Sequence, residues 1–493
     1  MKKPGWTCLS RRCCRSSRPA RLRSPTAGLA TAVAAAVFLA GGTSRAEDEN
    51  AAAAASETPP AGADRDAALQ QNPFTVSGLF NQRYRFRSSG AGQDQDIYGY
   101  LNLDGDYRAT SSNGPPPFER IRLNFQASSN LDIDDFKQAE DVRTDFEPFL
   151  DITNTFGSRF TGYIHSGYLS AVRLGPIDEL RLGRQMLYRE EGLLFDGGTV
   201  RTAPWNSFTF EAFGGLPAHL YESSRAGDAM AGATIESRPV EGLRLGADYV
   251  YIRDHGDDRP DAVDHLYIFR GRYLIGQEWA LDASGSWVDT RDRRQTLGLQ
   301  YVSQQWGLLA DFRFLRQNGI VDFQSSELSP YVFVEGKYAP FLEYQVNLHQ
   351  PWGRHFGTGA GVQIRDLQDR SEEGTFNHSF ENYYVSVDVI ELWQGSRATL
   401  RGDYWDADGQ DVYSTGFELE QKLCQIVTAR LGTSWSLYRI DPLTGAELNR
   451  DRIYYVRLRW HVTKRIDIDT DYEYEKDSQD DYHRVVAGFQ VSF

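Results

Sequence analysis

Strict alternation of apolar and polar residues, repeated from residue 74 to residue 493, is the feature that most restricts how this chain can fold. Near the start of this region Phe80 and Tyr84 alternate with Arg83 and Arg85. A period of two places successive side chains on opposite faces of a β-strand. No stretch of comparable length shows the period of a helix, so the sequence predicts an all-β fold.

Three properties of the alternating segments favour a barrel that spans a membrane over a soluble sandwich. The polar faces are unusually charged and hold many arginines. The apolar faces often begin or end with Tyr, Trp or Phe, as in the aromatic girdles of membrane barrels. The chain also ends in Phe493 within an alternating apolar segment, which resembles the assembly signal of bacterial outer-membrane barrels. We therefore expect the barrel assembly machinery to bind this end of the chain.

The sequence predicts a transmembrane antiparallel β-barrel of about 18 strands. A sheet in lipid must satisfy all its backbone hydrogen bonds and therefore must close. Alternation then turns apolar residues toward lipid and polar residues toward the lumen. Between about 18 and 22 segments alternate at a spacing of roughly 20 residues. We expect some of these segments to be loops, and bacterial single-chain barrels have even strand numbers.

Residues 1–46 have the layout of a secretory signal peptide. They contain nine basic and no acidic residues, an apolar run at 27–40, and small residues up to Ala46. Removal of residues 1–46 would take away nine positive charges and change the formal net charge from −15 to −24. Residues 47–73 are rich in Ala, Glu, Asp and Pro and are predicted to form a disordered arm. The barrel is therefore expected at 74–493, in the bacterial outer membrane and in contact with its lipid.

Charge and motifs argue against other classes of protein. The negative net charge disfavours nucleic acid as a partner. No phosphate-binding loop, Cys-x-x-Cys or His-Glu-x-x-His motif occurs, and the nine histidines are scattered. We expect neither an enzyme nor a cofactor. The acidic residues of 467–475 could hold Ca²⁺, but a solvated acidic face is the favoured interpretation.

One segment resembles a known family. Residues 178–201 contain Leu-Gly-Arg-Gln at 182–185, a short Glu/Gly loop, Phe-Asp-Gly at 195–197 and then Arg201. This pairing of motifs resembles the alginate export family, whose members are porin-like outer-membrane barrels of about 18 strands that carry an anionic polysaccharide outward. The wider resemblance is one of architecture and covers residues 74–493.

The resemblance implies a constriction of the lumen built from arginines with carboxylates nearby. It assigns Arg184 and Asp196 to the constriction most directly, with Arg181 and Arg201 beside them. The preceding segment carries His165 where members of the family usually carry an arginine, so alginate itself stays open as the substrate. By alternation Arg184 falls on an apolar face, and a β-bulge there would redirect it inward.

Alternation independently assigns further arginines to the lumen. The candidate pore-lining residues found in this way are Arg83, Arg85, Arg122, Arg365, Arg457 and Arg459. A planar guanidinium suits carboxylate and phosphate ligands, and a ring of arginines favours anions in a pore. Carboxylates are just as numerous on the same faces. Cross-strand ion pairs that hold the wall together are therefore the favoured role for any single arginine.

Together these patterns predict an outer-membrane channel that passes an anionic polysaccharide or small anionic solutes. A general or sugar-selective porin is the first alternative, and Tyr98, Tyr100, Trp405 and Tyr438 on polar faces would serve it. A barrel enzyme or an adhesin that acts through its loops is the second alternative.

Overall fold

A computed structural model describes residues 73–90, 92–109, 118–133, 158–188, 192–218, 227–254, 262–318, 340–369, 378–407, 410–438, 450–477 and 481–493. The predicted signal peptide and all but the last residue of the predicted arm lie outside the described residues. The described part of the chain is made of β-strands and their connections. Within it, no helix is long and apolar enough to cross a membrane.

The described residues form 22 strands that follow one another in chain order. Their bounds are β1 Phe74–Ser89, β2 Gly92–Arg108, β3 Arg120–Asp132, β4 Phe160–Leu174, β5 Ile177–Tyr188, β6 Gly192–Thr202, β7 Phe208–Pro217, β8 Ala229–Ser237, β9 Leu243–Asp254, β10 Ala262–Ile275, β11 Trp279–Val288, β12 Arg291–Val302, β13 Leu309–Gln317, β14 Phe341–Trp352, β15 Phe356–Leu367, β16 Phe380–Ile390, β17 Ser396–Ala407, β18 Gln410–Lys422, β19 Val427–Tyr438, β20 Arg450–Thr463, β21 Ile466–Lys476 and β22 Asp481–Ser492.

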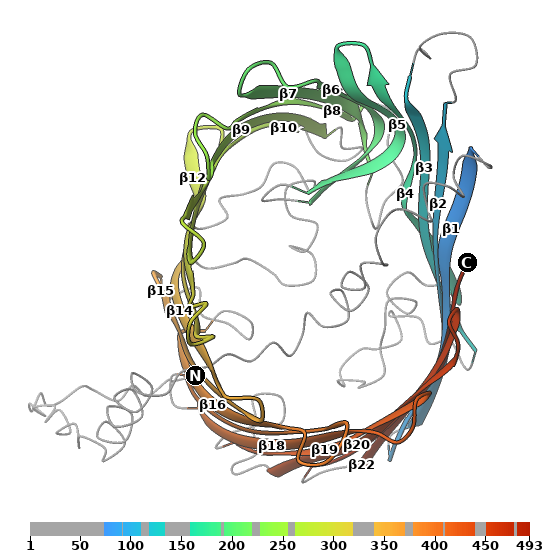
Figure 1. Ribbon diagram of the computed structural model, residues 1–493, viewed down its shortest axis with the longest axis vertical. Coiled ribbons are helices and arrows are strands. Elements are labelled where there is room, and N and C mark those ends of the chain that lie inside the picture. Colours follow the sequence, from blue (N-terminus) through green and yellow to red (C-terminus); the bar gives the residue numbers. More distant parts are fainter. Residues whose placement is uncertain are drawn as a thin grey trace, which may run out of the picture. The chain divides into compact units, whose positions relative to one another are not determined.

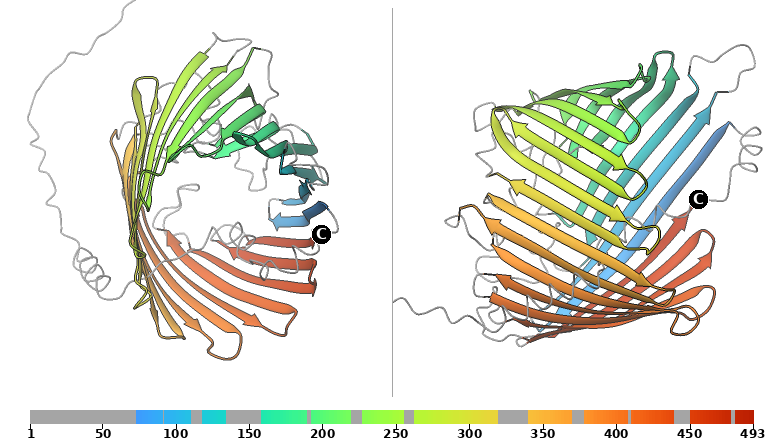
Figure 2. Two further views of the ribbon diagram at one scale, coloured as in Figure 1. Left: turned by 45° about the horizontal axis from the view of Figure 1, so that its top comes forward. Right: turned by 60° about the vertical axis from the view of Figure 1, so that its left-hand side comes forward.

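The sheet closes on itself. Each strand pairs antiparallel with the next strand along the chain, and β22 pairs with β1 (Figure 1). The closing register runs from Leu79 opposite Ser492 to Ser88 opposite His483. Figure 2 shows the strands inclined to the barrel axis, as the closure of a sheet requires. A closed sheet has no unpaired edge, so its backbone is satisfied without water.

The strand count of 22 shows that the prediction of about 18 strands is wrong. Segments that we expected to be loops are strands, because very short turns connect many of them. Two residues, 289–290, separate β11 from β12, and two more, 464–465, separate β20 from β21. A hairpin with such a turn uses almost all of its residues in strands, so every alternating segment can join the sheet.

Connections of different length distinguish the two ends of the barrel. At one end, the short-turn end, β1 begins, β22 ends, and turns such as 175–176 and 464–465 join the strands. At the other, the long-loop end, 133–159 connects β3 to β4 and 318–340 connects β13 to β14. Outer-membrane barrels have short periplasmic turns and longer extracellular loops. The long-loop end is therefore the extracellular end.

Side chains alternate between two faces around the whole barrel. The outer face is apolar, and several of its large side chains are more than half exposed, including Phe160, Leu182, Phe269 and Leu400. The inner face carries the charged residues, which meet across strands in rows such as Arg457 opposite Asp471. An apolar exterior around a polar lumen is the pattern of a barrel that faces lipid outside and water inside.

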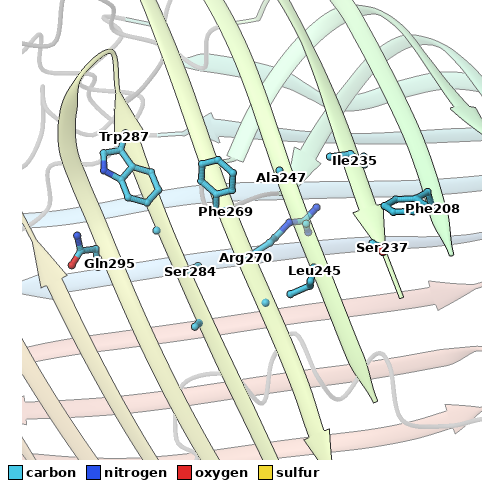
Figure 3. Close-up of a pocket in the computed structure, with 14 residues that line it drawn as sticks. Phe208, Ile235, Ser237, Leu245, Ala247, Phe269, Arg270, Ser284, Trp287 and Gln295 are labelled. Atoms are coloured by element: carbon cyan, nitrogen blue, oxygen red, sulfur yellow. The ribbon is translucent and has the colours of Figure 1, made fainter. Parts of the chain in front are cut away.

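The outer face is hollowed over β7 to β12, as Figure 3 shows in close-up. The hollow has a volume of about 680 Å³. Its lining combines large apolar side chains with residues that have little or no side chain, among them Phe208, Leu245, Phe269, Trp287, Ala247, Gly271, Ala283 and Gly285. Ser237, Arg270, Ser284 and Gln295 complete the lining. Because the lining is mostly apolar and lies on the outer face, hydrocarbon suits it better than water.

Candidate lumenal site

The register places every arginine that alternation predicted for the lumen on the inner face. Arg85 stands opposite Asp96, Arg365 opposite Glu343, and both pairs lie between neighbouring strands. The remaining candidates, Arg83, Arg122, Arg457 and Arg459, occupy inner-face positions of β1, β3 and β20.

Three of these arginines form ion pairs within the barrel wall. The pairs are Arg85–Asp96 at 2.6 Å, Arg365–Glu343 at 2.6 Å and Arg457–Asp471 at 2.7 Å. Asp96 is fully buried, whereas the side chain of Arg457 is 42 % exposed. Each pair joins adjacent strands, so these arginines have the wall-building role that we favoured for any single arginine.

Aromatic rings complete the surroundings of the paired arginines. The guanidinium carbon lies over a ring in each case, with distances to the centroid of 4.8 Å for Arg85 over Tyr98, 4.3 Å for Arg365 over Phe341 and 4.6 Å for Arg457 over Tyr455. A guanidinium held between a carboxylate and a ring has little freedom to turn toward a passing solute.

Arg83, Arg122 and Arg459 differ from the paired arginines. Within the described part of the chain, none of them makes an ion pair or a side-chain hydrogen bond. Arg83 stands opposite Gly488, and its side chain lies over the Gly488 backbone. A Cβ atom added to Gly488 would be 2.8 Å from Arg83 Cγ. Gly488 stands opposite Asp469, which in turn stands opposite Arg459. Two arginines therefore flank one aspartate along a row of the inner face.

The family-like motif forms the β5–β6 hairpin, and a line of glycines bends this hairpin away from the wall. Gly183 stands opposite Gly197, which stands opposite Gly215. Gly183 has φ +128°, a conformation that other residues rarely adopt. A Cβ on Gly197 would lie 2.7 Å from the Cα of Gly215, so the two backbones approach too closely for any side chain. The sheet can therefore bend sharply along this line.

Beyond the glycines, the hairpin packs against the inner face of the adjoining wall. Phe213 stands opposite Thr199, four residues along β6 from Phe195, yet the rings of Phe195 and Phe213 are only 5.5 Å apart. Such an approach requires the tip to fold over, and Figure 1 shows this hairpin inside the ring of strands. The contact buries a cluster made of Leu187, Leu193, Phe195, Phe213, Met230, Val250, Ile252, Leu266 and Ile268.

Sequence reasoning missed this apolar cluster, because alternation was expected to send apolar residues only toward lipid. A signal was present in the sequence. In the segments 249–252 and 266–269 both faces are apolar or aromatic, so the inner face of β9 and β10 also needs a dry partner. Ile252, Leu266 and Ile268 have no exposed surface, and the hairpin supplies their cover.

Arg184 and Asp196 form a bidentate ion pair on the hairpin, with Nε to Oδ1 and Nη2 to Oδ2 both at 2.7 Å. Arg184 Nη1 also donates to the carbonyl of Ile164 on β4 at 3.2 Å. The register between β5 and β6 is regular at Arg184 and shifts only between Ile177 and Glu179, so no bulge lies there. The pair occupies the face opposite Phe195, and the bend turns that face away from the β7–β10 wall.

The other residues implied by the family resemblance lie nearer the short-turn end. Arg181 Nη2 is 2.7 Å from Glu179 and its guanidinium lies over Tyr168. Arg201 Nη2 is 3.7 Å from Glu236, which also pairs with Arg270 at 3.0 Å. Both arginines are therefore parts of ion-pair groups on the inner face.

His165 does not take the place of the missing family arginine. It lies where the register of β3 with β4 shifts, and its Nε2 atom is 2.7 Å from the hydroxyl of Ser128. Its ring packs edge-on against Tyr163 at 4.8 Å. The interactions of His165 are thus with β3 and β4, and the carbonyl of Ile164 next to it receives Arg184 instead.

Two carboxylates of the acidic strand β21 pair with arginines, Asp471 with Arg457 at 2.7 Å and Glu473 with Arg484 at 2.8 Å. Asp467 Oδ1 lies within hydrogen-bond distance of His461 Nδ1, at 2.7 Å. Among the described residues no group of three or more His, Cys, Asp or Glu is arranged to hold a metal ion.

These features define the class of the protein. A closed antiparallel barrel with an apolar outside and a charged lumen is the architecture of a bacterial outer-membrane channel, which confirms the predicted membrane and barrel class. Arginine and carboxylate side chains interleave on its inner face.

No protein-family model matches the chain, and no curated protein matches it. Among solved structures, the chain is similar to OpdK from Pseudomonas aeruginosa, crystallised with vanillate, at 10 % identity and a TM-score of 0.41, covering 85 % of this chain and 99 % of that one. A BenF-like porin from Pseudomonas fluorescens Pf-5 is 9 % identical, with a TM-score of 0.44 and coverage of 85 % and 99 %. The translocation pore of the P pilus usher PapC is 9 % identical, with a TM-score of 0.49 and coverage of 84 % and 99 %.

Proposed function

We propose that the barrel is a passive channel that favours anionic solutes, and that Arg83 and Arg459 are the arginines that meet them. The observation that carries the proposal is the row in which both arginines flank the single carboxylate of Asp469. A paired guanidinium is neutralised by its own partner, whereas these two leave one positive charge uncompensated. That charge lowers the energy of an anion in the lumen.

The arrangement of aromatic rings favours anions over neutral sugars. Sugars bind to porins through exposed ring faces, and the inner face does carry Tyr98 and Trp405. One face of the Tyr98 ring is covered by Arg85, and Trp405 packs against Phe380 at 5.1 Å. Tyr98 and Trp405 therefore serve the wall more than a passing sugar.

We further propose that the transported solute is an anionic polysaccharide, on the basis of the motif in the β5–β6 hairpin. The bend places the Arg184–Asp196 pair on the face of the hairpin turned from the wall, which supports a constriction of the kind that the alginate export resemblance implies. The carboxylates of uronate units in the polysaccharide would compete with Asp196 for the guanidinium of Arg184.

The experiment that tests the anion preference is the reversal potential of single channels in a planar bilayer under a salt gradient. Arg83→Gln with Arg459→Gln is expected to reduce the anion-to-cation permeability ratio. The matched control is Arg365→Gln with Glu343→Gln, which removes a complete ion pair and keeps the net charge of the lumen. A cation-selective or non-conducting wild-type barrel would overturn the proposal, and so would equal ratios in the two double variants.

Uronate oligomers test whether the channel accepts an anionic polysaccharide in addition to small anions. Block of the wild-type current by oligoglucuronate but not by neutral oligosaccharides of the same length would support an anionic polysaccharide. Block by neutral oligosaccharides alone would favour a sugar-selective porin.

A further inference from the structure

Strands β20 to β22 carry basic side chains on the outer face, at the long-loop end, where the channel does not use them. Arg450 and Arg452 open β20, Lys476 ends β21, and His483 lies near the start of β22. The register shows that Arg452, Lys476 and His483 share the face of Tyr454. We call Arg450, Arg452 and Lys476 the basic patch.

The basic patch holds positive charge that the described part of the chain compensates only in part, through Asp481 opposite Lys476. Arg452 and Lys476 stand directly opposite each other, and like charges in such positions destabilise a sheet. Arg450 and Arg452 are exposed and make no ion pair or side-chain hydrogen bond with any described residue. Lys476 is 60 % exposed and pairs at 4.0 Å with Asp481, which stands opposite it on β22, so Arg450 and Arg452 carry the charge that is left uncompensated. An anion from outside the chain would relieve the repulsion.

A stack of rings lies directly beneath these charges. The ring centroids of Tyr454 and Tyr474 are 6.2 Å apart with planes at 18°, and those of Tyr474 and His483 are 5.0 Å apart with planes at 29°. The hydroxyl of Tyr472 is 3.0 Å from His483 Nδ1. Rings of this kind on the outer face of a barrel form the girdle at the membrane interface.

The position of the stack gives the depth of the charges. Arg452 and Lys476 are each two residues nearer the long-loop end than Tyr454 and Tyr474. At about 3.4 Å per residue, the charges lie roughly 7 Å farther along the strands than the rings, and less than that in depth because the strands are tilted. A group just beyond the girdle is at the level of the lipid headgroups, in the leaflet on the extracellular side.

We propose that the basic patch binds the phosphate of a lipid headgroup in the outer leaflet. Phosphate oxygens accept two parallel hydrogen bonds from one guanidinium, and a single phosphate between Arg452 and Lys476 neutralises the opposed pair. The acyl chains of the same lipid then lie along the girdle formed by Tyr454 and Tyr472, whose side chains are 43 % and 44 % exposed. This proposal does not depend on what the channel transports.

Native mass spectrometry of the full-length barrel in a neutral detergent tests the proposal. The probe is a short-chain phosphatidic acid, compared with phosphatidylcholine of the same chain length. The wild type is expected to retain phosphatidic acid at least several-fold better than phosphatidylcholine, and R452Q/K476Q is expected to lose that preference. The matched control is K464Q/R465Q, which removes two exposed basic residues from the opposite end of the same hairpin and is expected to keep the preference.

Thermal unfolding in the same detergent distinguishes binding from a structural role. Without phosphatidic acid, R452Q/K476Q is expected to unfold at the temperature of the wild type or above it, because the opposed charges are gone. Phosphatidic acid is expected to raise the unfolding temperature of the wild type and of K464Q/R465Q but not that of R452Q/K476Q. Equal retention of phosphatidic acid by all three proteins would overturn the proposal. Full replacement of the lipid by inorganic phosphate at equal concentration would overturn it too, since the site would then select free phosphate.

Discussion

Phe493 closes the seam of the barrel on Gly78. The amide of Gly78 donates to the carbonyl of Phe493 at 2.9 Å, and the amide of Phe493 donates to the carbonyl of Gly78 at 3.1 Å. The Phe493 ring lies over Gly78, in the space that a side chain on Gly78 would need. The last residue of the chain therefore joins β22 to β1 through two hydrogen bonds and a ring contact.

Gly78→Ala is expected to destabilise the seam. The added Cβ would lie 2.5 Å from Phe493 Cζ and 2.8 Å from the carbonyl oxygen of Asn102, so the backbone as well as the ring must shift. Overpacking of this kind costs about 1–3 kcal/mol. The electrophoretic shift between folded and unfolded barrel, followed against urea, measures the loss. Gly402→Ala is the control, because its Cβ would meet nothing closer than 3.9 Å. Equal midpoints for the two variants would contradict the expected seam contact.

The sequence predicted much of this architecture because alternation reports directly on the two faces of a strand. It assigned Arg85, Arg365 and Arg457 to the inner face, and the register agrees. It could not decide the number of strands, since alternation does not distinguish a strand from a polar loop that happens to alternate. It also could not show that Phe493 seals the sheet on Gly78, because that contact joins the first strand to residues more than 400 positions away in the chain.

Asp96→Ala is expected to destabilise the barrel strongly. Asp96 has no exposed surface and accepts hydrogen bonds from Arg85 at 2.6 and 3.0 Å. Removing one member of a buried ion pair costs about 3–5 kcal/mol. We expect the lower end of this range, because Arg85 is 22 % exposed and keeps Asp94 as a second partner at 3.8 Å. Urea unfolding of the barrel in detergent measures the difference in free energy.

Asp282→Ala is the matched comparison for Asp96→Ala. Asp282 pairs with Arg272 at 3.5 Å, and both side chains are about half exposed, at 47 % and 53 %. A pair in contact with water contributes about 0–1 kcal/mol. If Asp282→Ala costs as much as Asp96→Ala, burial is not what makes the Arg85–Asp96 pair important.

Phe195→Ala is expected to loosen the β5–β6 hairpin without opening the barrel. Phe195 has no exposed surface and joins the hairpin to Phe213 and the apolar cluster. Loss of a buried phenylalanine costs about 3–5 kcal/mol. Here we expect this loss to weaken the packing of the hairpin against the wall. We expect a larger and noisier single-channel conductance while the folded barrel still resists heat. Leu400→Ala, on the outer face, should leave conductance unchanged, and an unchanged conductance in Phe195→Ala would show that the hairpin does not narrow the lumen.

The hairpin also shows where sequence reasoning stops. The motif singled out Arg184 and Asp196, and the structure does bring them together. Their orientation depends on the bend at Gly183 and Gly197, which requires three strands to place glycines at matching positions. That match is a property of register, and register cannot be read from any one segment.

Arg184→Ala and a variant with Arg184 and Asp196 exchanged show whether this ion pair affects ion selectivity or only holds the hairpin in place. Arg184→Ala leaves Asp196 uncompensated, so we expect a reduced anion preference in the reversal potential together with weaker anchoring to the carbonyl of Ile164. Arg184→Asp combined with Asp196→Arg restores an ion pair of the same net charge. The exchanged variant is therefore expected to recover most of the anion preference, since the charge facing the lumen is again balanced. A selectivity that does not change in Arg184→Ala would place the pair outside the path of the ions, whatever its part in holding the hairpin.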